Sequence, residues 1–179
     1  SPTLSESNLT IASGATSTTL LSITVPSDAS ANVASSSVMV HAYSEGCGDD
    51  TTDDCEYGQN VSVSVTANQV YGLTASYYSN ETDVVKDTAS VQEGMQVQMK
   101  FTVTNNGNGN DEITLSLANA PAWVTLKQTT ALIGPGQTMT LTIDVAAPAS
   151  DARGSKTFQV TATSADGTTS STTGDLIVT

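Results

Sequence analysis

Positive charge is scarce in this chain. Its 179 residues include five Lys or Arg against 18 Asp or Glu, which gives a net charge of −13. Such a surface repels phosphate groups, so nucleic acid is not an expected partner. The same negative charge keeps a strand-rich protein soluble and discourages pairing between exposed sheet edges.

Long apolar runs and catalytic motifs are also missing. No apolar run approaches 18 residues, so no segment of this sequence is expected to span a membrane as a helix. The single histidine, His41, would have to serve as the base of a Ser-His-acid triad, but it lies in the alternating sequence 38–43, where an exposed strand position is expected. Phosphate-binding loops, HExxH and G-x-S-x-G motifs are absent from the sequence. We therefore predict that the chain is not an enzyme.

What the sequence does contain is apolar and polar residues that alternate with period two, the pattern of half-buried β-strands. Strands are expected at residues 70–78, 97–104, 113–117, 123–126, 139–145, 158–162 and 176–178. Turn residues separate them, notably the Asn- and Gly-rich run 105–110 and Gly134-Pro135-Gly136. Seven strands in about 110 residues are typical of an immunoglobulin-like β-sandwich. Trp123 is expected in its core.

An internal repeat divides the chain. The segment Gly136–Gly167 repeats Gly14–Gly46, and in each copy the first glycine lies twelve residues before a proline, Pro148 or Pro26. A period near 120 residues fits whole β-domains in tandem. The predicted fold class is therefore all-β, with tandem immunoglobulin-like sandwiches. Residues 70–179 form a complete one, and residues 1–69 form the C-terminal half of another.

The first half-domain is predicted to lack three leading strands. Its own strands are expected at Leu9–Ile11, Leu20–Val25, Val38–Tyr43 and Val61–Val65. Eight of their apolar side chains would then be partly exposed to water: Leu21, Ile23, Val25, Val38, Val40, Val61, Val63 and Val65. Each is worth about 1.5–3 kcal/mol when buried, so this half is not expected to fold alone. Two explanations are open: the natural chain continues upstream of Ser1, or another subunit donates the missing strands.

Two cysteines, Cys47 and Cys55, enclose the sequence GDDTTDD. A disulfide that closes this short loop is favoured over a zinc site, and it would indicate an oxidising, extracellular location. The loop holds four candidate calcium ligands, Asp49, Asp50, Asp53 and Asp54. Their spacing fits no EF-hand, so a solvated acidic loop is the alternative. The run Asn106–Glu112 is a second, weaker candidate for calcium, which its turn chemistry already explains.

Other surface features concern sugars. Asn8, Asn60 and Asn80 begin N-glycosylation sequons and are candidate attachment sites. Five tyrosines lie between positions 43 and 78: Tyr43, Tyr57, Tyr71, Tyr77 and Tyr78. Such aromatic residues could form a sugar-binding platform, although packing between the two domains is the simpler interpretation.

The second domain resembles the NEW3 type of immunoglobulin-like domain, associated with alpha-galactosidases, and the related CARDB and APHP domains. The similarity lies in FTVTNNGNGNDEITLSL at 101–117, APAWVTL at 120–126 and the segment 132–164, and its last part recurs in 9–46. The first domain departs from the pattern in its cysteine-containing loop and in lacking the Asn-Gly turn and the Trp stretch. The resemblance implies a stalk or accessory module of a bacterial or archaeal surface protein or secreted enzyme.

Together these features predict a structural segment of a secreted, multi-domain cell-surface protein, such as a stalk, an S-layer or sheath component or a filament subunit. Its expected partners are copies of itself or neighbouring repeats, with glycans as covalent modifications and strand complementation as a route of assembly. No cofactor is expected apart from the calcium considered above. The alternative is an accessory carbohydrate-binding or spacer module of a secreted hydrolase.

Overall fold

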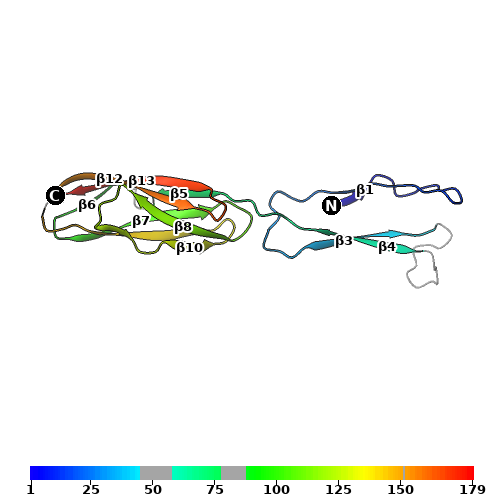
Figure 1. Ribbon diagram of the computed structural model, residues 1–179, viewed down its shortest axis with the longest axis horizontal. Helices are drawn as coiled ribbons and strands as arrows, with labels where there is room; N and C mark the ends of the chain where they lie inside the picture. The colour runs from blue at the N-terminus through cyan, green and yellow to red at the C-terminus, as the bar shows by residue number, and fades with distance from the viewer. Residues whose placement is uncertain (45–57, 78–87, 151) are drawn as a thin grey trace, which may run out of the picture. The chain divides into compact units, whose positions relative to one another are not determined.

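The computed structural model describes residues 1–44, 58–77, 88–150 and 152–179 (Figure 1). The chain forms two compact units, Ser1–Asn68 (unit 1) and Gln69–Thr179 (unit 2). Every regular element in these described residues is a β-strand, so the predicted all-β class is confirmed. No described segment forms a helix with the length and hydropathy needed to cross a bilayer.

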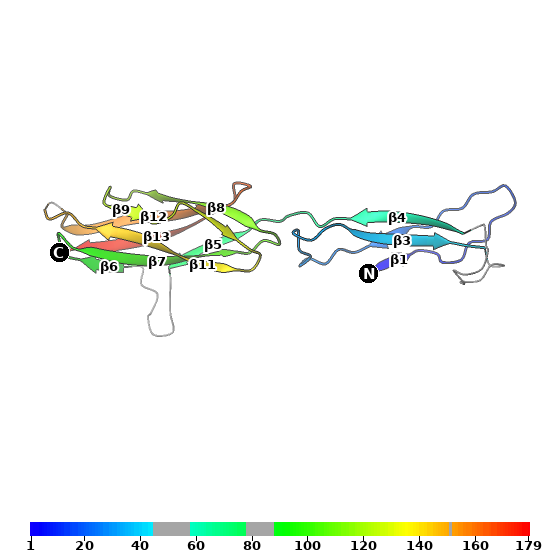
Figure 2. The ribbon, with the colours of Figure 1, turned by 90° about the horizontal axis from the view of Figure 1, so that it is seen from below.

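Unit 2 is an immunoglobulin-like sandwich of two sheets (Figure 2). Its strands are β5 (Leu73–Tyr77), β6 (Thr88–Val91), β7 (Gln96–Asn105), β8 (Asp111–Ala118), β9 (Val124–Leu126), β10 (Thr130–Ile133), β11 (Thr138–Ala146), β12 (Gly154–Thr163) and β13 (Thr169–Val178). One sheet has the order β5-β7-β11-β9, and the other has the order β10-β8-β12-β13-β6. The described strand pairs are antiparallel except β13 with β6, which run parallel.

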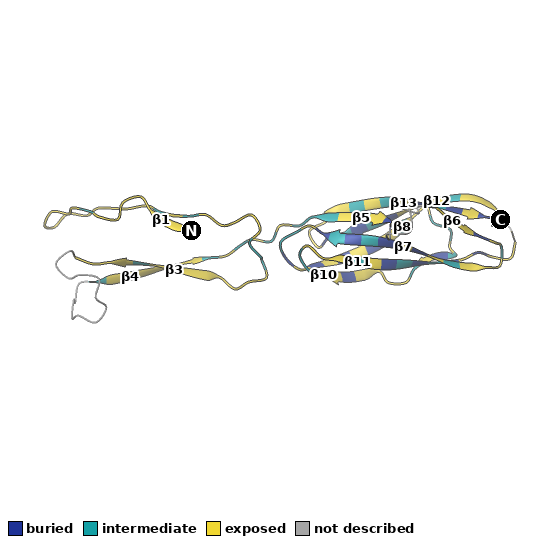
Figure 3. Ribbon diagram, turned by 180° about the vertical axis from the view of Figure 1, so that it is seen from behind, coloured by how far each residue is buried: buried dark blue, intermediate teal, exposed yellow. Residues whose placement is uncertain are grey.

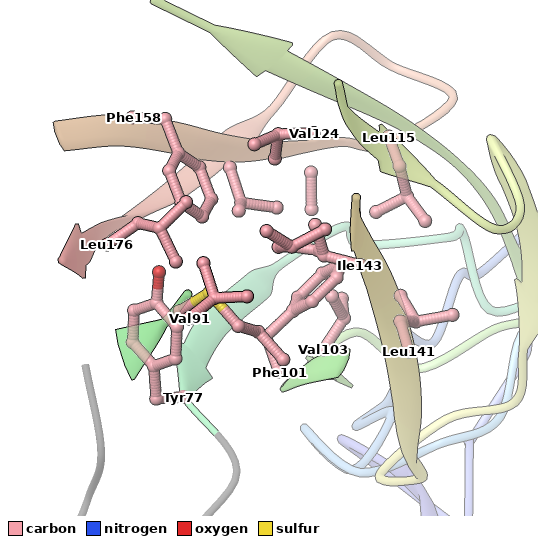
Figure 4. Packing of buried hydrophobic residues seen from close by; sticks show 14 of the residues in the cluster. Tyr77, Val91, Phe101, Val103, Leu115, Val124, Leu141, Ile143, Phe158 and Leu176 are labelled. Carbon is pink, nitrogen blue, oxygen red and sulfur yellow. The ribbon is translucent and has the colours of Figure 1, made fainter. Parts of the chain in front are cut away.

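The core of unit 2 follows from the period-two pattern. Along β7 the side chains of Met99, Phe101 and Val103 point inward and are buried, while Gln98 before them and Lys100 among them are exposed. Phe101 belongs to one buried cluster with Ile143, Leu176 and Phe158 from β11, β13 and β12 (Figure 4). These side chains join the two sheets into one hydrophobic core, which is the main stabilising contribution to unit 2.

Unit 1 has four described strands in two separate pairs. These are β1 (Pro2–Leu4) with β2 (Leu21–Ile23), and β3 (Ser36–Ala42) with β4 (Gln59–Val65), both antiparallel. Its strands are largely exposed or half-buried, whereas buried positions recur along the strands of unit 2 (Figure 3). No residue with a buried hydrophobic side chain belongs to the described part of unit 1.

Several expectations about individual strands were wrong. Leu9–Ile11 is not a strand, and unit 1 begins instead with β1, which the alternating pattern did not predict. In unit 2 the short strands β6 and β10 were missed. Trp123 is only partly buried and packs at the margin of the core, because it directly precedes the short edge strand β9.

Candidate functional site

The first strand pair of unit 1 repeats the register of a pair in unit 2. Leu4 of β1 lies opposite Leu21 of β2, and Leu126 of β9 lies opposite Ile143 of β11. Each unit 2 residue in this comparison is numbered 122 higher than its unit 1 counterpart, and the two remaining pairs follow the same offset. The sequences PTL and VTL therefore occupy the same place in the two units.

A backbone hydrogen bond beyond these strands repeats with the same offset. The amide of Ser5 donates to the carbonyl of Leu20 at 2.9 Å, and the amide of Lys127 donates to the carbonyl of Thr142 at 3.1 Å. The repeat recognised from Gly14 onward thus extends back to Pro2. Applying the constant offset to the residues before Gly14 would have identified β1 from the sequence.

The second pair of unit 1 also has a counterpart. β3 and β4 form an antiparallel pair in which Val40 lies opposite Val61. In unit 2, β12 and β13 form the equivalent antiparallel pair, with Val160 opposite Thr172. The matched segments VHAYSEG and VTATSADG place Val40 and Val160 at equivalent positions. Each pair of unit 1 therefore corresponds to part of one sheet of unit 2.

Unit 2 shows which strands belong beside these pairs. The free side of β11 is covered by β7, the free side of β12 by β8, and the free side of β13 by β6. In the described residues of unit 1, β2, β3 and β4 each have a strand neighbour on one side only. We call the uncovered sides of β2 and β3 the open edges of unit 1. They are the candidate functional site, because unpaired strand edges are templates for pairing with another segment.

The space between the two pairs of unit 1 is incompletely filled. One hollow of about 290 Å3 is lined by residues that include Ile23, Val33, Val38 and Val65. A second, of about 230 Å3, lies between β1, β2 and β3. The equivalent space in unit 2 is occupied by side chains such as Phe101 and Ile113, which come from β7 and β8. The hollows lie where the absent strands would place their inward-facing residues.

The eight apolar side chains of unit 1 that were expected to be partly exposed are all accessible to water. Val25, Val61 and Val63 are exposed, Val61 to 61%, and the other five are half-buried. At equivalent positions in unit 2, Ile143 and Val160 are 0% exposed. Both units carry apolar residues at these positions. The difference in exposure therefore comes from the strands that cover them in unit 2 and have no equivalent in the described part of unit 1.

Most of the predicted site residues lie outside the described residues. These are Cys47, Cys55, Asp49, Asp50, Asp53, Asp54 and Asn80. Of the other two sequons, Asn8 is exposed outside any strand, and Asn60 is exposed on β4 opposite His41. His41 is itself exposed, and its ring lies 5.5 Å from that of Tyr43. Within the described residues, His, Cys, Asp and Glu form no group of three or more that could hold a metal ion.

The Asn-rich run after β7 is a turn held by its own side chains. The buried Asn105 donates from Nδ2 to the carbonyls of Gly109 and Ile133, both at 2.8 Å, and its Oδ1 accepts from the amide of Gly107 at 2.8 Å. At the start of β8, the buried Asp111 accepts from Ser164 Oγ at 2.5 Å and from the amide of Ala165 at 3.1 Å. These contacts explain the run as a turn, because the Gly109 carbonyl and the Asp111 carboxylate accept hydrogen bonds within the fold.

A second carboxylate joins two turns of unit 2. Glu93, between β6 and β7, accepts from the amide of Ala152 at 3.1 Å and from Arg153 Nε at 2.9 Å. The hydrogen bond from Arg153 is the main cause that lowers the pKa of Glu93, and the amide of Ala152 adds to it. Asp166, in the turn before β13, likewise has a lowered pKa, first because it accepts from the amide of Thr168.

The described tyrosines do not form one platform. Tyr77 is buried in the core cluster of unit 2, so its ring is not exposed for binding a sugar. Tyr71 is half-buried, and Tyr43 of unit 1 is 50% exposed. Tyr57 and Tyr78 lie outside the described residues.

Comparisons with known proteins give resemblance at the level of fold. No family model matches the chain, and no curated protein matches it. Among solved structures, it is similar to an SrpA adhesin from Streptococcus sanguinis (13% identity, TM-score 0.44, 62% of this chain and 58% of that chain). It is also similar to a PapD-like domain of human CEP192 (9%, 0.42, 59% and 82%) and to the periplasmic chaperone SfaE (18%, 0.40, 60% and 56%).

Proposed function

We propose that this chain is a structural segment of a secreted, cell-surface protein that is built from tandem immunoglobulin-like sandwiches. The observation that carries the proposal is the repeated register: β1 with β2 and β9 with β11 pair residue for residue at a constant offset of 122. A sandwich preceded by a second unit that repeats part of its design fits the tandem organisation of stalks, sheaths and filaments. The NEW3-type resemblance supports the same structural role, and this role involves no catalysis.

The surface of the chain suits an extracellular structural role. The charge of −13 keeps neighbouring copies apart unless a specific contact is made. The exposed sequons at Asn8 and Asn60 are accessible to glycosylation. A disulfide between Cys47 and Cys55 would hold the loop between β3 and β4 closed in an oxidising compartment. These properties would suit a stalk, an S-layer component or a filament subunit.

Unit 2 is also arranged to resist tension. The chain enters it through β5 and leaves from the opposite end through β13 (Figure 1). Tension on the two ends therefore acts along β13. This strand pairs in parallel with β6. Just beyond the end of β13, the amide of Thr179 donates to the carbonyl of Val91 at 3.0 Å. Hydrogen bonds loaded along the strand direction must break together, whereas those at a peeled edge break singly.

The proposal is tested by stretching single molecules of the chain between reference domains. Unit 2 is expected to unfold in one event at a force well above that of a peeled hairpin. Ala89→Pro, which removes a backbone donor from β6, should lower this force, whereas Leu132→Ala, at an exposed position of β10, should not. Unfolding at low force by both the native chain and Ala89→Pro would contradict a tension-bearing role.

A binding assay separates this role from that of an accessory module of a hydrolase. Native gels cast with soluble polysaccharides should leave the mobility of the chain unchanged. Retardation in such a gel, lost on Tyr43→Ala, would overturn the structural proposal in favour of carbohydrate binding, since Tyr43 is the exposed tyrosine among those described.

A further inference from the structure

The open edges of unit 1 have a defined geometry. β11 pairs with β7 from Thr138 opposite Thr104 to Ala146 opposite Gln96. β12 pairs with β8 from Gln159 opposite Ala118 to Thr163 opposite Thr114. Because β2 and β3 repeat β11 and β12, these two pairings specify the direction and register of any strand that completes unit 1. Both incoming strands would be antiparallel to their neighbours.

The side chains that such strands must carry are also specified. Ile143 lies opposite Met99, so Leu21 of β2 should face an apolar residue of the incoming strand. Val160 lies opposite Leu117, so Val40 of β3 should face another. The hollows beside Val38 require large inward side chains, as Phe101 and Ile113 provide in unit 2.

Charge argues against a second copy of unit 1 as the occupant. Residues 1–68 contain no Lys or Arg, and all five basic residues of the chain lie in unit 2. Two copies of unit 1 placed edge to edge would bring together like charges only. The strand of the β7 pattern instead carries a base, Lys100, on its exposed face, whereas the two acids of the β7–β8 segment, Asp111 and Glu112, lie at the start of β8.

We propose that the open edges of unit 1 bind a polypeptide segment with the pattern of β7–β8. One strand of this segment would pair with β2 and the next with β3, joined by a turn at one end of the unit. The two strands then belong to different sheets, as β7 and β8 do in unit 2. Main-chain hydrogen bonds would supply affinity, and the alternating apolar side chains would supply the register. This inference rests on the proposed tandem-sandwich function and specifies the partner that the function requires.

The test uses the full chain and a synthetic peptide of residues 96–118 as the probe. Amide hydrogen exchange is measured by NMR with and without the peptide. Exchange at the open edges, in β2 and β3, should slow about tenfold or more when the peptide is bound. Exchange in β11 and β12 should not change, which shows that unit 2 keeps its own strands. A control peptide with Phe101→Asp and Ile113→Asp, which cannot fill the hollows, should produce no effect.

The other outcomes contradict the inference in distinguishable ways. No slowing with the native peptide, in a chain whose unit 2 remains protected, would show that the open edges are not an acceptor of this pattern. Slow exchange at β2 and β3 without peptide in a dimeric sample would identify a second copy as the occupant. The same result in a monomer would show that these edges are already covered. If unit 2 resists force in the stretching experiment but the peptide does not slow exchange, the structural role is supported and the proposed partner of unit 1 is excluded.

The acceptor side is tested by Val38→Asp in the full chain. Val38 contributes to both hollows, and it lies outside unit 2. The substitution should abolish the peptide-dependent slowing at β2 and β3 and leave exchange in unit 2 unchanged. Peptide binding that survives Val38→Asp would show that the peptide contacts some other surface.

Discussion

Leu21 and Ile143 occupy equivalent positions in the two units, yet only Ile143 is fully buried. Each lies opposite a leucine of a short edge strand, Leu4 or Leu126. Ile143 is also covered by Met99 of β7 on its other side, while Leu21 has no such neighbour among the described strands. The difference in burial therefore arises from strand coverage, since both positions carry a large aliphatic side chain.

This relationship predicts unequal effects of matched truncations. Ile143→Ala should lower the free energy of unfolding of unit 2 by about 2–5 kcal/mol, because it opens a cavity in a filled core. Leu21→Ala should leave that transition unchanged. Trp123 is the only tryptophan of the chain and belongs to unit 2, so its fluorescence during urea unfolding reports this unit alone. Equal shifts for the two variants would contradict the division into separate units.

Asn105 is predicted to be the most important polar residue of the turn after β7. Asn105→Ala would leave the carbonyls of Gly109 and Ile133 without their side-chain donor in a buried site. A loss of about 2–4 kcal/mol is expected. The exposed side chain of Asn106 donates to Thr74 Oγ1 at 2.7 Å, so Asn106→Ala should cost less than about 1 kcal/mol. The urea midpoints of the two variants, compared at an unchanged denaturant m-value, check the prediction. It is contradicted if Asn106→Ala loses more stability than Asn105→Ala.

Gly174 is predicted to be required by close packing in unit 2. A Cβ at this position would collide with the Tyr77 hydroxyl and approach Cζ of Phe158 to 2.8 Å. Gly174→Ala should therefore destabilise unit 2 by about 1–3 kcal/mol. Gly72→Ala is the control, because its nearest neighbour would lie at an ordinary 3.5 Å. Thermal unfolding followed at Trp123 separates the two, and an unshifted midpoint for Gly174→Ala would refute the packing.

The pH dependence of unit 2 should include a contribution from Glu93. Its pKa is lowered in the folded state by Arg153 and Ala152, so the ionised carboxylate stabilises the fold. This contribution is fully present above the pKa of the unfolded state and is lost as the pH falls through the lowered pKa of the folded state. Glu93→Gln should have a lower midpoint than the native chain at pH 7, and the gap should narrow toward pH 3. A gap that does not change with pH would exclude this origin.

The sequence predicted most strands of unit 2, but it found only the last residues of the long strand β13 and missed the short strands β6 and β10. β7, β11 and β12 have enough alternating residues to define a buried face, as Met99, Phe101 and Val103 illustrate. β6 and β10 have four residues each, too few for a period to be distinguished from chance. β1 contains Pro2 in only three residues, which weakens its local preference for a strand.

Leu9–Ile11 shows why local pattern was insufficient. By the offset of 122, these residues correspond to residues 131–133 in β10, which is a strand because it pairs with β8. Unit 1 has no strand equivalent to β8 in its described residues, so the same pattern finds no partner there. Strand formation depends on non-local pairing, and only the structure shows which pairings are available. The sequence predicted that unit 1 lacks leading strands, but only the pairing of β2 and β3 on one side each identifies the open edges that this leaves.

The most direct measurement is amide hydrogen exchange of the full chain without any added peptide. Backbone amides of β11 and β12 should exchange only through global unfolding of unit 2, whereas amides of β2 and β3 should exchange orders of magnitude faster. This result would show that the repeated strands of unit 1 lack the coverage that β7 and β8 provide in unit 2. Equal protection of β2 with β11, and of β3 with β12, in a monomeric sample would contradict the account.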